Sequence, residues 1–330
     1  MADVSIGPPD GDRLFGGDGA RDADRAQLLL VAGLVMAVSL VTLVVLLNAT
    51  IYSENVATRG VESADGEALE VRSTVIEATG ELLDATNRAE PDTHVDAATT
   101  VRDGVDDLDR EVSRSYAERG GVARIELLEI RNGSRITGDI AGNGTGDPDT
   151  STLAASVTRT RGFVLDVEYE SLADSDAAGP PADAFHVDLD NSTRSRQVYV
   201  YNGSDGNVTV AVGDDGNEPA VRCEAPPDDP DGNVTVDLTG ERLGDRPCPG
   251  VWPTLFVVPS DPYDIALVNA SATDGEAAVT ARPDSGDTVD TDFATGRQPA
   301  VYETTIDLRY RTAELRFETA VRVAPGEPDA

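Results

Sequence analysis

The chain has 330 residues, with 61 acidic side chains against 26 basic ones, a formal net charge of −35 and a pI near 4.1. All 26 basic residues are arginine, since the sequence contains no lysine. The negative charge excludes nucleic acid as a partner. The missing lysine excludes P-loop NTPases, Schiff-base enzymes and protein kinases.

An acidic surface without lysine is typical of proteins from halophiles, because molar salt shortens the Debye length to about 3 Å and screens self-repulsion. Disorder is the alternative for so charged a chain. Apolar residues make up 39% of the sequence and gather into periodic runs, so we predict a folded protein.

Residues 28–47 form a run of twenty residues without a charge, LLLVAGLVMAVSLVTLVVLL. At 1.5 Å per residue this run makes about 30 Å of helix, the thickness of a bilayer core, and predicts a transmembrane helix. A cleaved secretory signal is the alternative, but its apolar region is usually about 7 to 15 residues and ends in a small-residue cleavage site. Arg13, Arg21 and Arg25 precede the run and the next arginine is Arg59, so the positive-inside rule places the N-terminus in the cytoplasm.

Asparagine usage supports an extracellular location for the rest of the chain. Eight of the eleven asparagines lie in Asn-x-Ser/Thr sequons, which are acceptors for N-glycosylation. The alternative is that these residue types meet by chance in turns, as at Asn-Gly pairs. The predicted glycosylation sites are Asn132, Asn143, Asn191, Asn202, Asn207, Asn233 and Asn269, with the eighth sequon, Asn48, next to the bilayer.

Cys223 and Cys248 are the two cysteines of the sequence, and we predict that they form a disulfide. The bridge would close a loop of about 26 residues and contribute about 3.5 kcal/mol in the chain-entropy model. Such bonds persist in oxidising compartments. No histidine lies beside either cysteine, so a zinc site is disfavoured.

Beyond the membrane segment the apolar pattern predicts two helices. The first has apolar pairs seven residues apart, at 68/69, 75/76 and 82/83, and the second begins near Pro91 to Thr93 and ends at Gly120 and Gly121. A short proline turn between them favours an antiparallel helical hairpin. The alternative is that the apolar seam packs against neighbouring subunits.

From residue 122 onward the apolar period changes to two, which predicts about ten short strands separated by Gly, Asp and Pro. The Asn132-Gly133 pair is interpreted as a hairpin turn. These features predict a two-layer antiparallel β-sandwich and an α+β chain. Its predicted parts are a cytoplasmic leader over 1–27, a transmembrane helix over 28–47, an extracellular helical stalk over 48–121 and an extracellular β-sandwich over 122–330.

The sequence Arg25-Ala26-Gln27 directly before the apolar run resembles the processing signal of archaeal type IV pilin-like proteins, including archaellins. The stretch from Asn48 to Arg59 also resembles haloarchaeal pilin-like membrane proteins of unassigned function. The resemblance covers about residues 24 to 130. It implies that a prepilin-type peptidase cuts between Ala26 and Gln27 and that pilin-like subunits assemble through the apolar helix.

Two features depart from the pilin pattern. The fifth residue of the processed chain would be Val31, where many bacterial pilins have glutamate, and Ala26 rather than glycine precedes the cut. An ordinary membrane anchor, with Arg25 as its cytoplasmic flank, is the alternative.

The sequence shows no constellation typical of catalysis. It has two histidines, His94 and His186, and lacks the Gly-x-Ser-x-Gly, His-Glu-x-x-His and Gly-x-Gly-x-x-Gly motifs. The aspartates at 228, 229 and 231, and those at 214 and 215, are oxygen-rich candidates for Ca²⁺ or Mg²⁺, but they do not follow the EF-hand spacing. Trp252 is a candidate ligand-facing aromatic residue or, alternatively, part of a core.

The sequence therefore predicts a non-enzymatic, single-pass surface protein of a halophilic archaeon, pilin-like and with a glycosylated acidic head. No cofactor or bound metal is expected, and the expected partners are the bilayer, a prepilin-type peptidase and other pilin-like subunits. A monomeric surface-anchored binding module is the first alternative, and a cell-surface hydrolase is the second.

Overall fold

The structure is a computed structural model that separates the chain into two compact units, residues 1–64 and 65–330. It describes residues 66–328 apart from 142–148, 176–178, 192, 204, 228–231, 254–260 and 294–295, together with the isolated positions 36, 39, 40, 43 and 44. Among these residues no helix combines the length and the apolar character that crossing a bilayer requires. Most of residues 28–47, and the proposed cut between Ala26 and Gln27, lie outside the described part of the chain.

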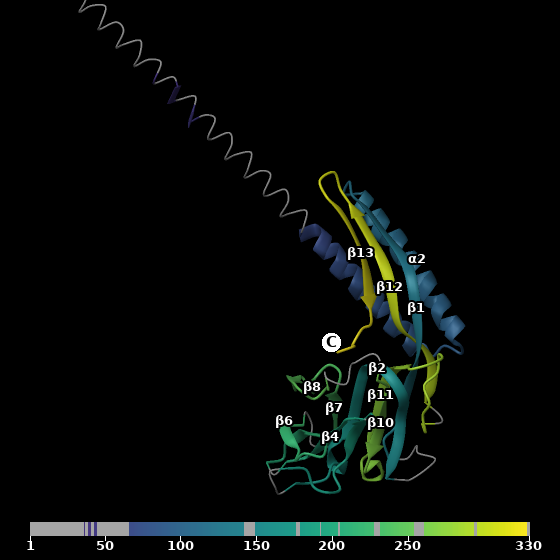
Figure 1. Cartoon of the computed structure of the whole chain (residues 1–330), viewed down its shortest axis with the longest axis vertical. Helices are drawn as coiled ribbons and strands as arrows, with labels where there is room; N and C mark the ends of the chain where they lie inside the picture. Colours follow the sequence, from purple (N-terminus) through teal and green to yellow (C-terminus); the bar gives the residue numbers. More distant parts are fainter. Residues whose placement is uncertain are drawn as a thin grey trace, which may run out of the picture. The chain divides into compact units, whose positions relative to one another are not determined.

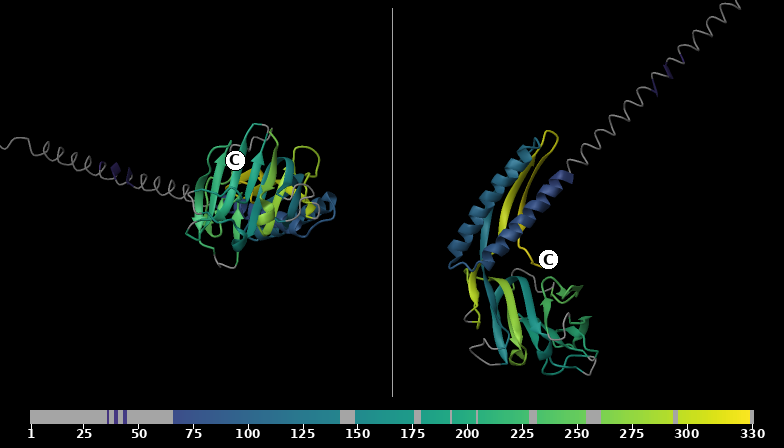
Figure 2. Two further views of the ribbon diagram at one scale, coloured as in Figure 1. Left: turned by 90° about the horizontal axis from the view of Figure 1, so that it is seen from below. Right: turned by 180° about the vertical axis from the view of Figure 1, so that it is seen from behind.

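Two helices form a layer on one end of the sheet. The first covers residues 66–88 and the second, α2, covers His94–Ala117. The hydroxyl of Thr93 caps α2 by accepting a hydrogen bond from the backbone N–H of Asp96 at 3.1 Å, which satisfies one of the unpaired donors of the first turn. The two helices lie side by side in the right-hand view of Figure 2, and α2 contacts β1 and β12.

The apolar seams of both helices face this sheet. Their buried side chains pack with those of β1, β12 and β13 into one core, which contains Val71, Val75, Leu83, Val101, Val105, Ile125, Ile306, Leu308 and Tyr310. The predicted helical stalk is therefore wrong: these helices are packed lengthwise on the sheet because their apolar faces match the apolar face of its strands. The alternative in which the seam contacts other subunits is not supported, since Leu83 is fully buried within the chain.

Thirteen strands of the described chain join in one hydrogen-bonded sheet, and every strand pair is antiparallel. The strands are β1 (Val122–Asp139), β2 (Thr150–Glu168), β3 (His186–Asp190), β4 (Ser195–Asn202), β5 (Val208–Asp214), β6 (Ala220–Ala225), β7 (Asn233–Asp237), β8 (Arg242–Leu243), β9 (Arg246–Pro247), β10 (Tyr263–Val268), β11 (Gly275–Pro283), β12 (Arg297–Arg311) and β13 (Arg316–Val323). Two short 3₁₀ helices cover Tyr169–Ser171 and Ala270–Ala272.

The strand order is β13-β12-β1-β11-β2-β10-β3-β4-β5-β6, and a branch starts at β2 with β7, which pairs with β8, which pairs with β9. Figure 1 labels β13, β12, β1, β11, β2 and β10 of this order. The predicted two-layer sandwich is therefore wrong. Long strands of 18, 19 and 15 residues, β1, β2 and β12, replace several of the short strands that the sequence predicted. Because β1 pairs with β12 over residues 122–136 and with β11 over residues 134–139, it connects the part of the sheet under the helices with the rest, and the described strands remain in one sheet.

Gly133 explains part of this error. The Asn132-Gly133 pair predicted a turn, but both residues lie inside β1, paired with Val301 and Ala300 of β12. A Cβ atom at position 133 would come within 2.6 Å of the carbonyl oxygen of Ala281. The glycine is therefore required by a close approach between neighbouring strands and not by a turn.

A second core fills the other end of the sheet. It includes Ile136, Phe163, Leu165, Val187, Leu189, Ile265 and Phe293. The predicted disulfide between Cys223 of β6 and Cys248 is confirmed, with the two Cα atoms 5.3 Å apart, and Cys248 belongs to this core. The bridge therefore ties the edge strand β6 to the segment that follows β9.

The helix layer generates the first prediction. Replacing Leu83, which is fully buried, by alanine should lower the free energy of unfolding by about 3 kcal/mol, because the substitution leaves a cavity between helix and sheet. Replacing Leu69, which is 62% exposed on the same helix, by alanine should change the free energy of unfolding by less than about 0.5 kcal/mol. Urea denaturation of both variants measures the difference, and equal losses would contradict the packing of this helix on the sheet.

Candidate functional site

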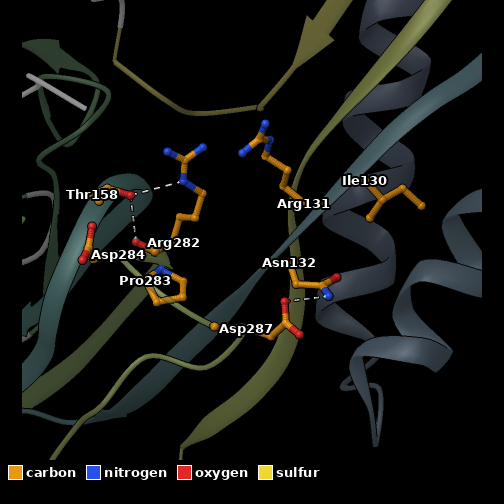
Figure 3. Close-up of a pocket in the computed structure, with 9 residues that line it drawn as sticks. Ile130, Arg131, Asn132, Thr158, Arg282, Pro283, Asp284 and Asp287 are labelled. Atoms are coloured by element: carbon orange, nitrogen blue, oxygen red, sulfur yellow. Dashed lines mark hydrogen bonds between the residues drawn. The ribbon is translucent and has the colours of Figure 1, made fainter. Parts of the chain in front are cut away.

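A polar cavity of about 320 Å³ lies beside the middle of β1. Figure 3 shows its lining, which comes from β1, β2, β11 and the segment after β11. The lining residues are Ile130, Arg131, Asn132, Thr158, Arg282, Pro283, Asp284, Gly286 and Asp287. We call it the β1 cavity.

Two arginines and two aspartates line the β1 cavity, and Figure 3 shows Asp284 beside Thr158 on the side of Arg282, with Asp287 near Asn132. Figure 3 shows the side chains of Arg131 and Arg282 extending toward the same end, away from Asp287. The Nε of Arg282 donates to the hydroxyl of Thr158 at 3.2 Å, and the amide of Asn132 donates to Asp287 at 3.2 Å. The cavity can therefore meet a polar ligand with donors at one end and acceptors at the other.

Behind the β1 cavity lies a buried charge network that is centred on Glu303 of β12. The Glu303 side chain is 7% exposed, and one of its oxygens lies 3.3 Å from Nε of Arg131 and 3.5 Å from a terminal nitrogen of Arg282. Its other oxygen pairs with Arg322 of β13. Three strands thus supply three arginines to one carboxylate, which offsets the desolvation of a buried charge.

Glu327 in the C-terminal tail is the second centre of this network. Its carboxylate, 8% exposed, pairs with Arg322, with Arg159 of β2 at 2.9 Å and with the hydroxyl of Tyr302 at 3.1 Å. Burial alone would raise the pKa of Glu327, but the hydrogen bonds and charges of Arg322 and Arg159 outweigh it and hold this pKa below its ordinary value. Burial also raises the pKa of the Tyr302 hydroxyl well above its usual range.

A second cavity, of mixed polarity and about 490 Å³, lies near β3 and β4. The rings of His186 and Tyr199 stack there with centroids 4.6 Å apart. Two cross-strand pairs along, Gln197 donates to Asp188 at 3.1 Å. Burial raises the pKa of Asp188 despite that hydrogen bond.

The structure separates the candidate residues that the sequence singled out. His94 of α2 bonds the carbonyl oxygen of Gly133 at 2.9 Å, far along the chain from His186 of β3. Trp252 is 3% exposed and belongs to the core, as the packing alternative expected. Asp214 accepts from Arg196 at 2.6 Å, and this hydrogen bond lowers its pKa.

No group of three His, Cys, Asp or Glu side chains in the part of the chain that the structure describes is arranged to hold a metal ion. The aspartates at 228, 229 and 231 lie outside that part.

The asparagine side chains of the sequons differ in exposure and in hydrogen bonding. Asn202 is 7% exposed and its amide donates to the carbonyl oxygens of Tyr169 and Leu172. The amides of four others are also engaged: Asn132 with Asp287, Asn191 with Asp261, Asn207 with Asp205 and Asn269 with the carbonyl oxygen of Ala184. Asn233 is exposed at the start of β7 and its side chain bonds no described residue, while Asn48 and Asn143 lie outside the description.

The model of a family of unknown function (DUF7261) matches residues 22–138. The match includes the helix of residues 66–88, α2 and nearly all of β1, and it ends before β2. No curated protein and no solved structure matches the chain. The charge network around Glu303 and Glu327 lies almost wholly outside the matched range.

Glu327 generates the second prediction. Because its pKa is lowered in the fold, its contribution to stability is present at neutral pH and is lost as the pH falls from about 5 through its folded-state pKa. Glu327→Gln should therefore lower the free energy of unfolding at pH 7 by about 3 kcal/mol and flatten its decline in acid. Chemical denaturation at a series of pH values measures both effects.

Glu314→Gln is the matched control, since Glu314 is exposed and forms no ion pair with a described residue. Equal losses in the two variants, or an unchanged acid slope in Glu327→Gln, would contradict the assigned role of the network.

Proposed function

We propose that the chain is a membrane-anchored surface protein whose folded unit lies outside the cell and serves a structural or assembly role. The disulfide between Cys223 and Cys248 carries this proposal, because disulfides persist in oxidising surroundings and are rare in the cytosol. The uncharged run of residues 28–47 supports the anchor, and the arginines before it support a cytoplasmic N-terminus.

The helix packing limits how such a protein could assemble. Most apolar side chains of the two helices are buried in the chain's own core, so in the described part of the helices only single exposed apolar residues such as Leu69 remain for a neighbouring subunit. Assembly with other pilin-like subunits would then depend on the apolar run of residues 28–47. The resemblance at Arg25-Ala26-Gln27 supports processing by a prepilin-type peptidase before that step.

A monomeric, surface-anchored binding module is the second candidate function. The β1 cavity favours it, because the guanidinium groups of Arg131 and Arg282 lie away from the carboxylate of Asp287 in a cavity of about 320 Å³. A ligand that carries both donors and acceptors would match this division of charge. In this case the N-terminal run would anchor the protein without assembling it.

The mature N-terminus distinguishes the two candidates. If the chain is pilin-like, mass spectrometry of the protein isolated from its native membrane should find Gln27 as the first residue, because the peptidase removes residues 1–26. An Ala26→Asp variant, which places a charge beside the cut, should accumulate uncut. Native protein that retains residues 1–26 would overturn the pilin-like assignment and favour the lone anchor.

Glycosylation provides a separate test of the extracellular location. Asn233 should carry a glycan because it is exposed and Thr235 of its sequon is also exposed. Asn202 should be bare, because its amide is buried in two backbone hydrogen bonds. Glycopeptide mapping of the native protein measures both occupancies. A glycan on Asn202 with an unmodified Asn233 would contradict the prediction.

A further inference from the structure

A cavity of about 250 Å³ lies near the end of the helix of residues 66–88. It is lined by that helix, by β1, β2 and β11, and by residues 325–326 of the C-terminal tail. Three arginines, Arg88, Arg135 and Arg161, line it together with one acid, Asp84. We call it the arginine cavity.

Two of these arginines belong to one row across three neighbouring strands. Arg135 of β1 lies opposite Thr280 of β11, and Thr280 lies opposite Arg161 of β2. Directly opposed residues in a sheet place their side chains on the same face. Since neighbouring strands are about 4.8 Å apart, the backbones that carry the two arginines are roughly 10 Å apart, with a threonine between them.

Arg161 is buried with its hydrogen bonds incomplete. Its side chain is 3% exposed, and its terminal nitrogens donate to Asp84 at 2.8 Å and to the carbonyl oxygens of Pro325 and Val301 at 2.9 and 3.1 Å. Its Nε is buried and has no acceptor among the described residues. A buried N–H of a charged group without an acceptor is costly, so an oxygen supplied from outside the chain would stabilise it.

The other two arginines add charge that the described chain does not neutralise. Arg135 is half-buried and Arg88 is exposed, and neither forms an ion pair with a described residue. With Asp84 as the one acid of the lining, the cavity holds three positive charges against one negative charge. This excess is local, because the whole chain carries −35.

We propose that the arginine cavity binds a phosphate-type oxyanion. Guanidinium groups present fork-shaped sets of N–H donors that match the oxygens of phosphate, and charge-assisted hydrogen bonds of this kind are the strong ones. The cavity also leaves room beyond one phosphate group, so the group belongs to a small phosphomonoester or to free phosphate. This proposal is independent of how the chain is anchored.

The test is isothermal titration of the full-length chain in detergent, at constant ionic strength, with inorganic phosphate and separately with glucose 6-phosphate. Both probes should bind, and tighter binding of the ester would identify the phosphomonoester as the ligand class. Arg135→Gln should weaken the binding of each about tenfold, which corresponds to about 1.4 kcal/mol. Arg88→Gln should weaken it less, because Arg88 is exposed.

Arg311→Gln is the matched control. It removes the same charge from an exposed arginine that faces Val122 at the opposite end of β1. Circular dichroism verifies that each variant is folded. The proposal is overturned if neither probe binds, if Arg135→Gln binds as tightly as the unaltered chain, or if Arg311→Gln weakens binding as much as Arg135→Gln does.

Discussion

Two buried carboxylates hold the two ends of the sheet and the C-terminal tail together. Glu303 draws arginines from β1, β11 and β13, and Glu327 draws them from β2 and β13. Arg322 pairs with both, so the two centres form one network. A buried ion pair is weak as a source of net stability, but removing one partner leaves a charge without compensation. The positions of the long strands and of the tail are therefore constrained by mutual neutralisation.

Such a network explains why arginine suits the interior of this chain better than lysine would. One guanidinium can donate in several directions at once, as Arg161 does to a carboxylate and two backbone carbonyls. A lysine ammonium is a compact, strongly hydrated point charge, and burying it would cost more hydration for fewer fixed hydrogen bonds. Salt largely screens exposed charges that are more than a Debye length apart, whereas buried pairs such as Arg159 with Glu327 are screened much less.

Local patterns predicted the local elements well. The start of α2 after Thr93, its end before Gly120, and the disulfide between Cys223 and Cys248 follow from capping residues, glycines and cysteine count. The sheet topology could not be predicted in this way. Alternation indicates that a strand has one buried face, but it does not reveal its neighbours, and the pairs around Glu303 join residues up to 172 positions apart, as with Arg131. The turn predicted at Gly133 was wrong because a glycine required by a close backbone approach has the same sequence signature as one required by a turn.

The two cavities lined by arginine differ in how far acidic residues of the chain neutralise their charge. Two aspartates line the β1 cavity, and Glu303 pairs with both Arg131 and Arg282. The positive charges of these two arginines are therefore largely neutralised within the chain. The arginine cavity has Asp84 alone, and a donor of Arg161 is left without an acceptor. In a chain with more than two acids for each arginine, supplying another carboxylate to Arg161 would have required little change in composition. A buried guanidinium N–H that lacks an acceptor therefore indicates a site for an external anion more clearly here than it would in a protein of balanced charge.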